Sequence, residues 1–541
     1  MVSILVIFTV SLIERKVFSN YKKNMESNSR TIKSLKNAQV SLFYYVVQIL
    51  LGFWSRKVFF DYLGSELLGL DITASNLLGM LNLAEMGVGT SVAYFLYKPL
   101  FDGDTRSINR MVALQGWIYR RVAFVIIGAS AVMMMFFPII FAKADVPSWC
   151  PYATFGVMLY GSLLGYFINF KQIVLSADQK GYKVSKVTQG ASIIFKVIVL
   201  VALPYVSYPF WWYIGMNFFG STFGCLWLSH VLRKEYPWLS VKGIKGREVL
   251  KENPEVLKKT GQVFIHNVSG MIFNQICPLL MYKFTSLTII AYYGNYLMVA
   301  GKLGGIMALI FGGTGAAVGS LIASGDKKHT IRVFWELMDS RLCISWIGLF
   351  TIYVIVQPFI SVWLGPKYLL SNTIVALLIV QQAISINRTT VDSFLSGNGQ
   401  FRDVWAPIAE GTFLLVCAYV LGHFLGIEGV LLSIIIAQTI FVGIWKPYFL
   451  FCKGFHLSWN NYFIPFLKRC ALLSLSAIFY FYIFKLYDFS KIGNFLTLAL
   501  AGLLVLVIVT ISQFVVFQYC TQGMKDFSNR MKFVIVNKIK R

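Results

Sequence analysis

The chain has 541 residues, of which 57% are hydrophobic and only 13% are charged, and its mean hydropathy is +0.67. Soluble proteins carry about 25% charged residues, so this composition excludes a soluble enzyme, a disordered chain and a secreted disulfide scaffold. Lysine and arginine outnumber the acids by 49 to 23, a net charge of +26. Contact with the membrane surface explains this excess in so apolar a chain, and we expect no nucleic-acid partner.

Fourteen apolar runs are long enough to cross the membrane, which requires about 20 helical residues each. The sequence therefore predicts an all-α polytopic membrane protein with about 14 transmembrane helices. The second and eighth runs contain glycines and a charge, so we expect each to be broken, kinked or strongly tilted. The runs cover residues 39–58, 67–97, 117–142, 151–171, 187–205, 208–230, 262–282, 288–322, 342–363, 370–395, 405–425, 429–446, 464–485 and 494–519.

Most basic residues fall in the N-terminal segment, in alternate loops and in the C-terminal tail. Lysine and arginine near helix ends stay on the cytoplasmic side, so both termini are predicted to be cytoplasmic. Residues 1–13 are apolar but too short to span a bilayer, and they lack the features of a signal peptide. Met25 opens a polar, basic lead-in to the first helix. We therefore expect translation to start at Met25, with the residues before it as an upstream extension.

An internal repeat with an offset near 220 residues joins the two halves of the chain. Ala38-Gln39-Val40 matches Gly261-Gln262-Val263, and Gly103-Asp104 matches Gly325-Asp326. Because each half has six spans, the repeat predicts two parallel six-helix lobes around a central cavity, plus two extra C-terminal helices. The expected domains are a cytoplasmic segment 1–38, an N-lobe 39–232, a basic linker 233–261, a C-lobe 262–450, and helices 13 and 14 with a basic tail 451–541.

Motifs for cofactors, metals or catalysis are not indicated. The eight cysteines and five histidines are dispersed and no phosphate-binding loop occurs, so we predict no disulfide framework, no metal site, no cofactor and no ATP hydrolysis. Asp102-Gly-Asp104 resembles a glycosyltransferase D-x-D motif, but a turn or helix cap is the preferred interpretation. The glycines of the segment 313–319 favour close helix packing over dinucleotide binding.

Charges inside the apolar runs form the candidate site, because a charge at mid-bilayer costs about 3 kcal/mol unless it faces a cavity or a partner. For Arg388 and Asp392, four residues apart, a simple intrahelical salt bridge is the preferred interpretation. For Arg56 and Lys302 we favour a cavity position over snorkelling or an ion pair between helices. The candidate residues are Arg56, Lys57, Asp71, Glu85, Lys196 and Lys302 for substrate, and Arg388, Asp392 and Glu410 for a coupling ion or gating.

Basic side chains in a membrane cavity suit an anionic cargo. A guanidinium group can hold phosphate oxygens through two parallel hydrogen bonds, and an ammonium group adds a point charge. Phosphate or pyrophosphate is therefore the predicted anion, and tyrosine and tryptophan could supply stacking surfaces for sugars beside their usual interfacial positions.

Two blocks resemble a known family. Residues 62–99, YLGSELLGLDITASNLLGMLNLAEMGVGTSVAYFLYKP, closely resemble the second-helix signature of Wzx-type polysaccharide flippases. A second block, formed by Pro407-Ile-Ala-Glu410-Gly411, Gly426-Ile-Glu-Gly429-Val and Trp445-Lys446-Pro447, resembles helices 11 and 12 of the same family. The resemblance extends from about residue 31 to the C-terminus.

This resemblance implies membership of the multidrug, oligosaccharidyl-lipid and polysaccharide exporter (MOP) superfamily, with 14 helices and a cationic cavity. It also implies that undecaprenyl-pyrophosphate-linked oligosaccharide units are flipped to the outer leaflet of a bacterial inner membrane for O-antigen, capsule or exopolysaccharide assembly. Polysaccharide polymerase and assembly proteins would be partners. Related lipid II flippases carry an essential arginine and an aspartate to which Arg56 and Asp71 look like counterparts.

The predicted mechanism is alternating access without covalent chemistry, so the chain is not expected to be an enzyme. The phosphates would meet Arg56 and Lys302, the polyprenyl tail would stay in lipid, and Asp392 or Glu410 would carry a coupled proton or sodium ion. A cation-coupled multidrug antiporter of the same superfamily is one alternative. A membrane-embedded polysaccharide polymerase or acyltransferase is the alternative from a different class.

Overall fold

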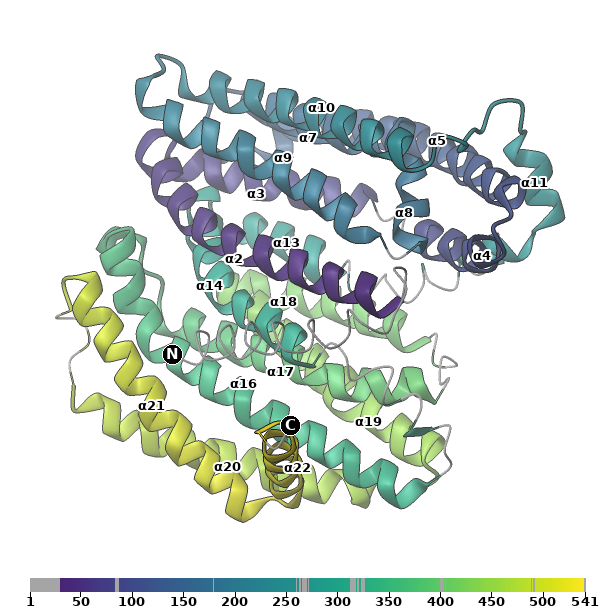
Figure 1. Ribbon diagram of the computed structural model, residues 1–541. Coiled ribbons are helices and arrows are strands. Elements are labelled where there is room, and N and C mark those ends of the chain that lie inside the picture. Colours follow the sequence, from purple (N-terminus) through teal and green to yellow (C-terminus); the bar gives the residue numbers. More distant parts are fainter. Residues whose placement is uncertain are drawn as a thin grey trace. The chain divides into compact units, whose positions relative to one another are not determined.

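The computed structural model describes residues 30–82, 87–178, 180–258, 260–261, 264, 270, 272–311, 318, 321–322, 326–398, 403, 405–487, 489 and 492–539. Every regular element among them is a helix (Figure 1), which confirms the predicted all-α class. Seven described helices are long and apolar enough to cross a membrane. The segments Cys150–Phe167 and Asn169–Ala177, bent by 64° relative to each other, raise the number to eight if they form one span. The chain is therefore a multi-pass membrane protein, and each of the predicted runs overlaps a described helix.

The α-helices are α2 (Arg30–Tyr62), α3 (Gly64–Leu81), α4 (Val88–Asp102), α5 (Thr105–Met135), α6 (Phe137–Ile140), α7 (Cys150–Phe167), α8 (Ile173–Ala177), α9 (Gly181–Ala202), α10 (Pro209–Glu235), α11 (Gly246–Glu252), α13 (Cys277–Phe284), α14 (Leu287–Phe311), α16 (Lys327–Trp363), α17 (Asn372–Gly397), α18 (Trp405–Ala437), α19 (Lys446–Phe449), α20 (Asn460–Lys485), α21 (Phe495–Cys520) and α22 (Gln522–Ile539). Short 3₁₀ or π-helical turns are η2 (Asn169–Gln172), η3 (Leu203–Tyr205), η4 (Ile272–Ile276), η5 (Pro366–Tyr368), η6 (Gln438–Trp445) and η7 (Leu450–Gly454).

The predicted break in the second apolar run is confirmed, because α3 ends at Leu81 and α4 begins at Val88 after Gly87, whose φ is 102°. The eleventh and twelfth runs meet inside α18 at Gly426, where φ is 59° and ψ is −134°. A Cβ at Gly429 would lie 2.0 Å from the Leu421 carbonyl oxygen, so only glycine allows the reversed chain to pack this closely. The glycines of the segment 313–319 lie outside the described residues.

The chain divides into two compact units. Unit 1 comprises Met1–Ser55, Gly87–Ile127 and Leu159–Thr260, and unit 2 comprises Arg56–Met86, Gly128–Met158 and Gly261–Arg541. In unit 1, α9 packs beside α10, and α8 packs against α4 and α9. In unit 2, α3 packs on α14, and α16 contacts α17, α21 and α22. The lobe boundaries drawn from the internal repeat stay a prediction.

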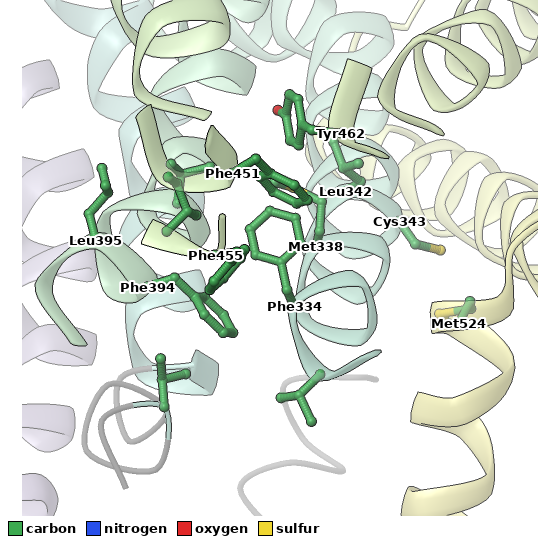
Figure 2. Packing of buried hydrophobic residues seen from close by; sticks show 14 of the residues in the cluster. Phe334, Met338, Leu342, Cys343, Phe394, Leu395, Phe451, Phe455, Tyr462 and Met524 are labelled. Carbon is green, nitrogen blue, oxygen red and sulfur yellow. The ribbon is translucent and has the colours of Figure 1, made fainter. Parts of the chain in front are cut away.

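The main hydrophobic core of unit 2 joins the predicted C-lobe to the C-terminal helices. Phe334 of α16 is fully buried, with its ring centroid 5.2 Å from those of both Phe394 and Phe451. Figure 2 shows these rings together with Tyr462 of α20 and Met524 of α22. Close van der Waals packing of large side chains is the main stabilising term in such a cluster.

Three ion pairs fasten the C-terminal helices to one face of α16. Its residues 332, 336 and 339 are three or four positions apart, so their side chains project from the same side. Arg332 Nε donates to Asp526 at 2.6 Å and Arg530 donates to Glu336 at 2.7 Å. The fully buried Asp339 accepts two hydrogen bonds from the Arg469 guanidinium, one of them at 2.8 Å, and that group lies 4.0 Å from the Trp335 ring.

The turn between α4 and α5 contains Asp102-Gly-Asp104. One oxygen of the Asp104 carboxylate accepts from the backbone N–H of Arg106 at 3.1 Å and of Ser107 at 3.0 Å. Hydrogen bonding from Ser107 holds the pKa of Asp104 below its ordinary value. Asp104 is therefore a helix cap, as predicted.

Candidate functional site

Unit 1 contains a polar cavity of about 500 Å³ among α7, α9 and α10. Lys196 of α9 lines it, and its side chain is exposed there. No other charged residue is among the described lining residues. The uncharged polar residues that line the cavity are Asn169, Gln172, Thr188, Ser192, Tyr213, Asn217 and Ser221.

Small residues bring the helices around this cavity close together. A Cβ at Gly161 of α7 would lie 3.0 Å from the Ser221 hydroxyl of α10, and one at Gly220 would lie 3.0 Å from the Phe195 ring of α9. Asn169 Oδ1 accepts from the Ser229 hydroxyl at 3.1 Å. The cavity can therefore offer one ammonium group together with hydroxyl and amide groups, which suits a phosphate or sugar ligand.

A separate ion-pair cluster lies at the start of α9 and the end of α10, which are predicted to be cytoplasmic. Lys180, just before α9, lies 2.7 Å from the Asp178 carboxylate and 2.8 Å from that of Glu235. The Tyr236 hydroxyl donates to Asp178 at 2.8 Å. Burial alone would lower the pKa of Lys180, but the two carboxylates outweigh it and raise that pKa. These charges fasten α9 to α10 and do not line the cavity.

Arg56 of α2, at the start of the unit 2 segment, lies against α14. A Cβ at Gly294 would lie 3.8 and 3.9 Å from its two terminal guanidinium nitrogens. Lys302 is partly buried and lies eight residues after Gly294 on α14. Eight residues correspond to about 12 Å along the helix axis. The structure thus brings Arg56 to the helix that carries Lys302, with about two helical turns between them.

The other predicted substrate residues that the structure describes lie on α2, α3 and α9. Asp71 is partly buried on α3, and Lys57 is exposed on α2. Glu85 lies outside the described residues. Lys196 belongs to unit 1, whereas Arg56 and Lys302 belong to unit 2.

A contact that the sequence interpretation missed joins α3 to the start of α14. The Thr288 hydroxyl donates to Glu66 and lies 3.4 Å from the Ser65 hydroxyl. A Cβ at Gly69 would lie 2.1 Å from the Leu287 carbonyl oxygen, so the helices can meet only where α3 has a glycine. Gly69 and Glu66 both lie in the family-like block 62–99, and their presence in that block is the sequence feature that could have indicated this contact.

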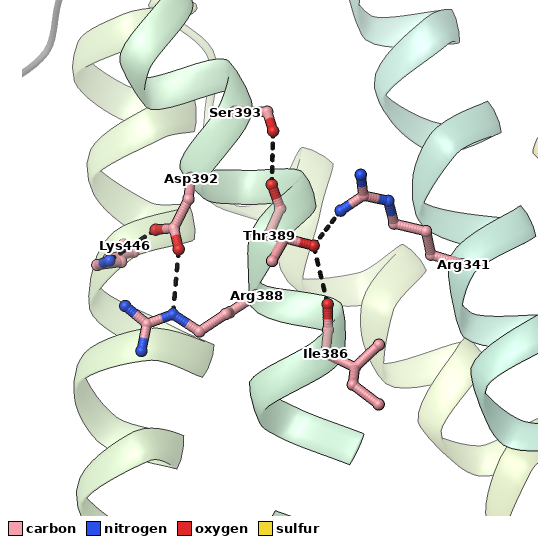
Figure 3. A network of polar contacts seen from close by, with 7 residues as sticks. All are labelled: Arg341, Ile386, Arg388, Thr389, Asp392, Ser393 and Lys446. Carbon is pink, nitrogen blue, oxygen red and sulfur yellow. Dashed lines mark hydrogen bonds and ion pairs between the residues drawn. The ribbon is translucent and has the colours of Figure 1, made fainter. Parts of the chain in front are cut away.

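The predicted salt bridge between Arg388 and Asp392 is present. Arg388 Nε donates to one Asp392 oxygen at 3.0 Å, and Lys446 donates to the other at 2.6 Å (Figure 3). Lys446 lies in the second family-like block, but its proximity to Asp392 could not be read from local spacing. Asp392 therefore has a cation on each oxygen, an arrangement that leaves little room for a coupling cation.

Arg341 of α16 is a further buried cation that was missed, because it stands just before the predicted run 342–363. Its side chain is 6% exposed, donates to the Thr389 hydroxyl and lies 4.7 Å from the Phe311 ring. In Figure 3, Arg341 and Lys446 approach α17 from opposite sides. Glu410, the last predicted coupling residue, is buried in α18 at 8% exposure.

Comparisons with known proteins identify the fold. No protein-family model matches the chain, and no curated protein sequence matches it. Several solved structures are similar.

An inward-facing multidrug resistance MATE family transporter of the MOP superfamily has a TM-score of 0.57 and 13% identity, covering 76% of this chain and 97% of its own. The lipid II flippase MurJ in an inward closed conformation has a TM-score of 0.62 and 14% identity, covering 88% and 97%. A MOP superfamily transporter from Pyrococcus furiosus has a TM-score of 0.51 and 11% identity, covering 80% and 100%. The chain thus has the fold of these MOP-superfamily transporters.

Proposed function

We propose that the chain flips undecaprenyl-pyrophosphate-linked oligosaccharide repeat units from the cytoplasmic to the outer leaflet of a bacterial inner membrane, as Wzx-type flippases do. The observation that carries this proposal is the polar cavity of unit 1, in which Lys196 lies among hydroxyl and amide groups inside apolar helices. A cation in such surroundings favours an anionic ligand with many hydroxyl groups, and a sugar diphosphate has both properties.

The lipid II flippase MurJ is the structural neighbour that motivates a lipid-linked cargo. The structural match to MurJ covers 88% of the chain, whereas the match to the inward-facing MATE transporter covers 76%. A flippase of lipid-linked units also needs no catalytic residues, since transport requires only two accessible states of one binding site.

In the proposed mechanism the head group first enters from the cytoplasmic side. The phosphates meet Arg56 and Lys302, and the polyprenyl tail stays in the bilayer. The polar cavity around Lys196 belongs to unit 1 and is a separate candidate contact for the cargo. Both chain termini remain cytoplasmic throughout.

The candidate residues for a coupled proton or sodium ion are Asp392 and Glu410. Asp392 is held by Arg388 and Lys446, so binding a proton or a sodium ion there would break two charge-assisted hydrogen bonds. Glu410 is a buried acid of α18 whose charge also acts on Arg388.

A cation-coupled multidrug antiporter is the second candidate, and the MATE neighbours favour it. The two functions differ in the lipid pool: loss of a flippase traps complete lipid-linked repeat units on the cytoplasmic leaflet, whereas loss of an antiporter changes drug tolerance and leaves the lipids unchanged. Incomplete repeat units would point instead to an enzyme.

The test measures polyprenyl-linked sugars by mass spectrometry after gene deletion, with an impermeant glycan-modifying reagent to report the leaflet. Complementation with Lys196→Gln, or with Arg56→Ala and Lys302→Ala together, is expected to leave complete units inside and to lower export at least tenfold. Lys186→Gln is the matched control, because it removes a lysine from α9 outside the cavity lining. Wild-type export by the charge-removing variants at normal protein abundance would reject the cationic site.

A further inference from the structure

A second hollow of unit 1 lies between the middle of α5 and the segment around α11. Its volume is about 610 Å³. The lining includes four basic residues and two aromatic rings, namely Arg120, Arg121, Lys245, Arg247, Trp117 and Phe124. No acid is among its described lining residues. We call this hollow the basic groove, and the proposed transport cycle does not use it.

The basic groove is a built feature, because the chain between α10 and α11 is tied to α5. The Asn109 side chain donates to the Trp238 carbonyl oxygen at 3.4 Å and accepts from the Ser240 N–H at 3.1 Å. Arg110 pairs with Glu252 at the end of α11. A Cβ at Gly246 would lie 2.4 Å from Trp117 Cβ, so the two segments meet only because residue 246 is glycine.

The cations of the groove are held in place on its α5 side. The Arg121 guanidinium lies 4.3 Å from the centroid of the Trp117 ring, and Arg120 Nε donates to the Gly116 carbonyl oxygen at 3.1 Å. On the α11 side, Lys245 lies 3.2 Å from the exposed Glu248. Because Arg120, Arg121 and Arg247 add three further charges, the groove keeps a positive excess that suits an anion.

One wall of the groove continues into an apolar surface. Phe124 is 65% exposed and its neighbour Val125 is 63% exposed, and α5 is one of the helices long and apolar enough to span the membrane. Arg120 and Arg121 lie near the start of the apolar run 117–142. Basic side chains near the end of such a run reach the headgroup level, while exposed apolar residues beyond them face the acyl chains. A ligand that fits both surfaces has an anionic head and a hydrocarbon tail.

We propose that the basic groove binds an anionic glycerophospholipid of the cytoplasmic leaflet. Arg120, Arg121 and Arg247 hold the phosphate group, and one acyl chain lies along Phe124. Basic pockets on the cytoplasmic side of membrane helices recognise phospholipid headgroups in this way. The bound lipid fastens α11 to α5 and so anchors the linker between the two sequence repeats.

Native mass spectrometry of the full-length protein in detergent tests this proposal by titration with phosphatidylglycerol, phosphatidylcholine and inorganic phosphate. We expect phosphatidylglycerol to bind at least tenfold more tightly than phosphatidylcholine. The triple variant Arg120→Gln, Arg121→Gln, Arg247→Gln should lose at least tenfold in affinity for phosphatidylglycerol. A control that removes three exposed charges elsewhere, Lys242→Gln, Lys251→Gln, Lys258→Gln, should bind within twofold of the wild type.

Two variants guard against misfolding and identify the ligand. Arg247→Gln alone should weaken phosphatidylglycerol binding about fivefold, and Phe124→Ser should weaken it without changing the response to inorganic phosphate. Equal affinity of the wild type and the triple variant would overturn the proposal, as would equal binding of phosphatidylcholine. Displacement of phosphatidylglycerol by substoichiometric undecaprenyl phosphate would assign the groove to the carrier lipid and reject a phospholipid. These readouts do not depend on transport.

Discussion

In unit 1, Lys196 lies in a cavity whose other described lining residues are all uncharged, whereas in unit 2 the fully buried Asp339 lies against the Arg469 guanidinium. Both charges belong to apolar helices. A buried charge with a dedicated opposite partner mainly holds helices together, because removing one partner leaves the other uncompensated. A cation that lines a polar cavity instead lies where a ligand can reach it. Stability and transport should therefore respond differently to loss of charge at these two places.

The largest stability effect is expected for Arg469→Met. Loss of the guanidinium leaves the Asp339 carboxylate buried without its partner, which costs about 3–5 kcal/mol. Thermal unfolding of the purified protein in detergent, monitored as loss of the monodisperse peak, measures the change in stability. The neighbouring Lys468 is exposed on the same helix, so Lys468→Gln is the control. Equal stability of the two variants would show that the pair at Asp339 is not structural.

A smaller loss is expected for Asp392→Asn. The substitution keeps the shape of the side chain but removes the charge that holds Arg388 and Lys446. Hydrogen bonds to charged groups contribute about 1.5–3 kcal/mol, and partial exposure here places the loss at the lower end. The same unfolding assay measures it, with Asp145→Asn in an exposed loop as control. A variant as stable as this control would argue that Asp392 is free to exchange its partners during transport.

Lys196→Met should change stability by less than about 1 kcal/mol, in either direction, because the exposed ammonium group lines a cavity. Transport should nevertheless fail when the leaflet position of the lipid-linked units is measured with the impermeant glycan-modifying reagent. A loss of stability as large as that of Arg469→Met would remove the contrast between the two units.

The smallest effect is expected at Asp104, which is fully exposed. Asp104→Ala should speed hydrogen exchange at the Arg106 and Ser107 amides, whereas Asp104→Asn should retain the cap. Since hydrogen bonding lowers the pKa of Asp104, its contribution is complete above the ordinary value of 3.8 and is lost as the pH falls through the lowered value. Protection of these two amides should therefore decrease only in acid, and an unchanged rate there would contradict the cap.

Local sequence patterns predicted much of the fold. The apolar runs, the break in the second run and the separation of runs 405–425 and 429–446 follow from hydropathy and glycine positions, which depend on residues close in the chain. The bridge from Arg388 to Asp392 was predictable for the same reason, since the helix repeat brings residues four apart together.

The contacts that the sequence did not predict join distant segments. Asp339 and Arg469 are 130 residues apart, and Glu66 and Thr288 are 222 apart. No periodic signal relates such positions, and Arg341 was overlooked because its burial depends on Phe311 and Thr389 from other helices. The cavity around Lys196 likewise depends on how α7, α9 and α10 pack.

The three ion pairs on α16 also have a consequence for the order of synthesis. Asp339 leaves the ribosome 130 residues before Arg469, and Glu336 precedes Arg530 by 194 residues. At a rate of about 5–20 residues per second, the delay for Asp339 is roughly 10 s. During that interval the charged face of α16 must remain in contact with water, lipid headgroups or the insertion machinery, because its partners belong to α20 and α22.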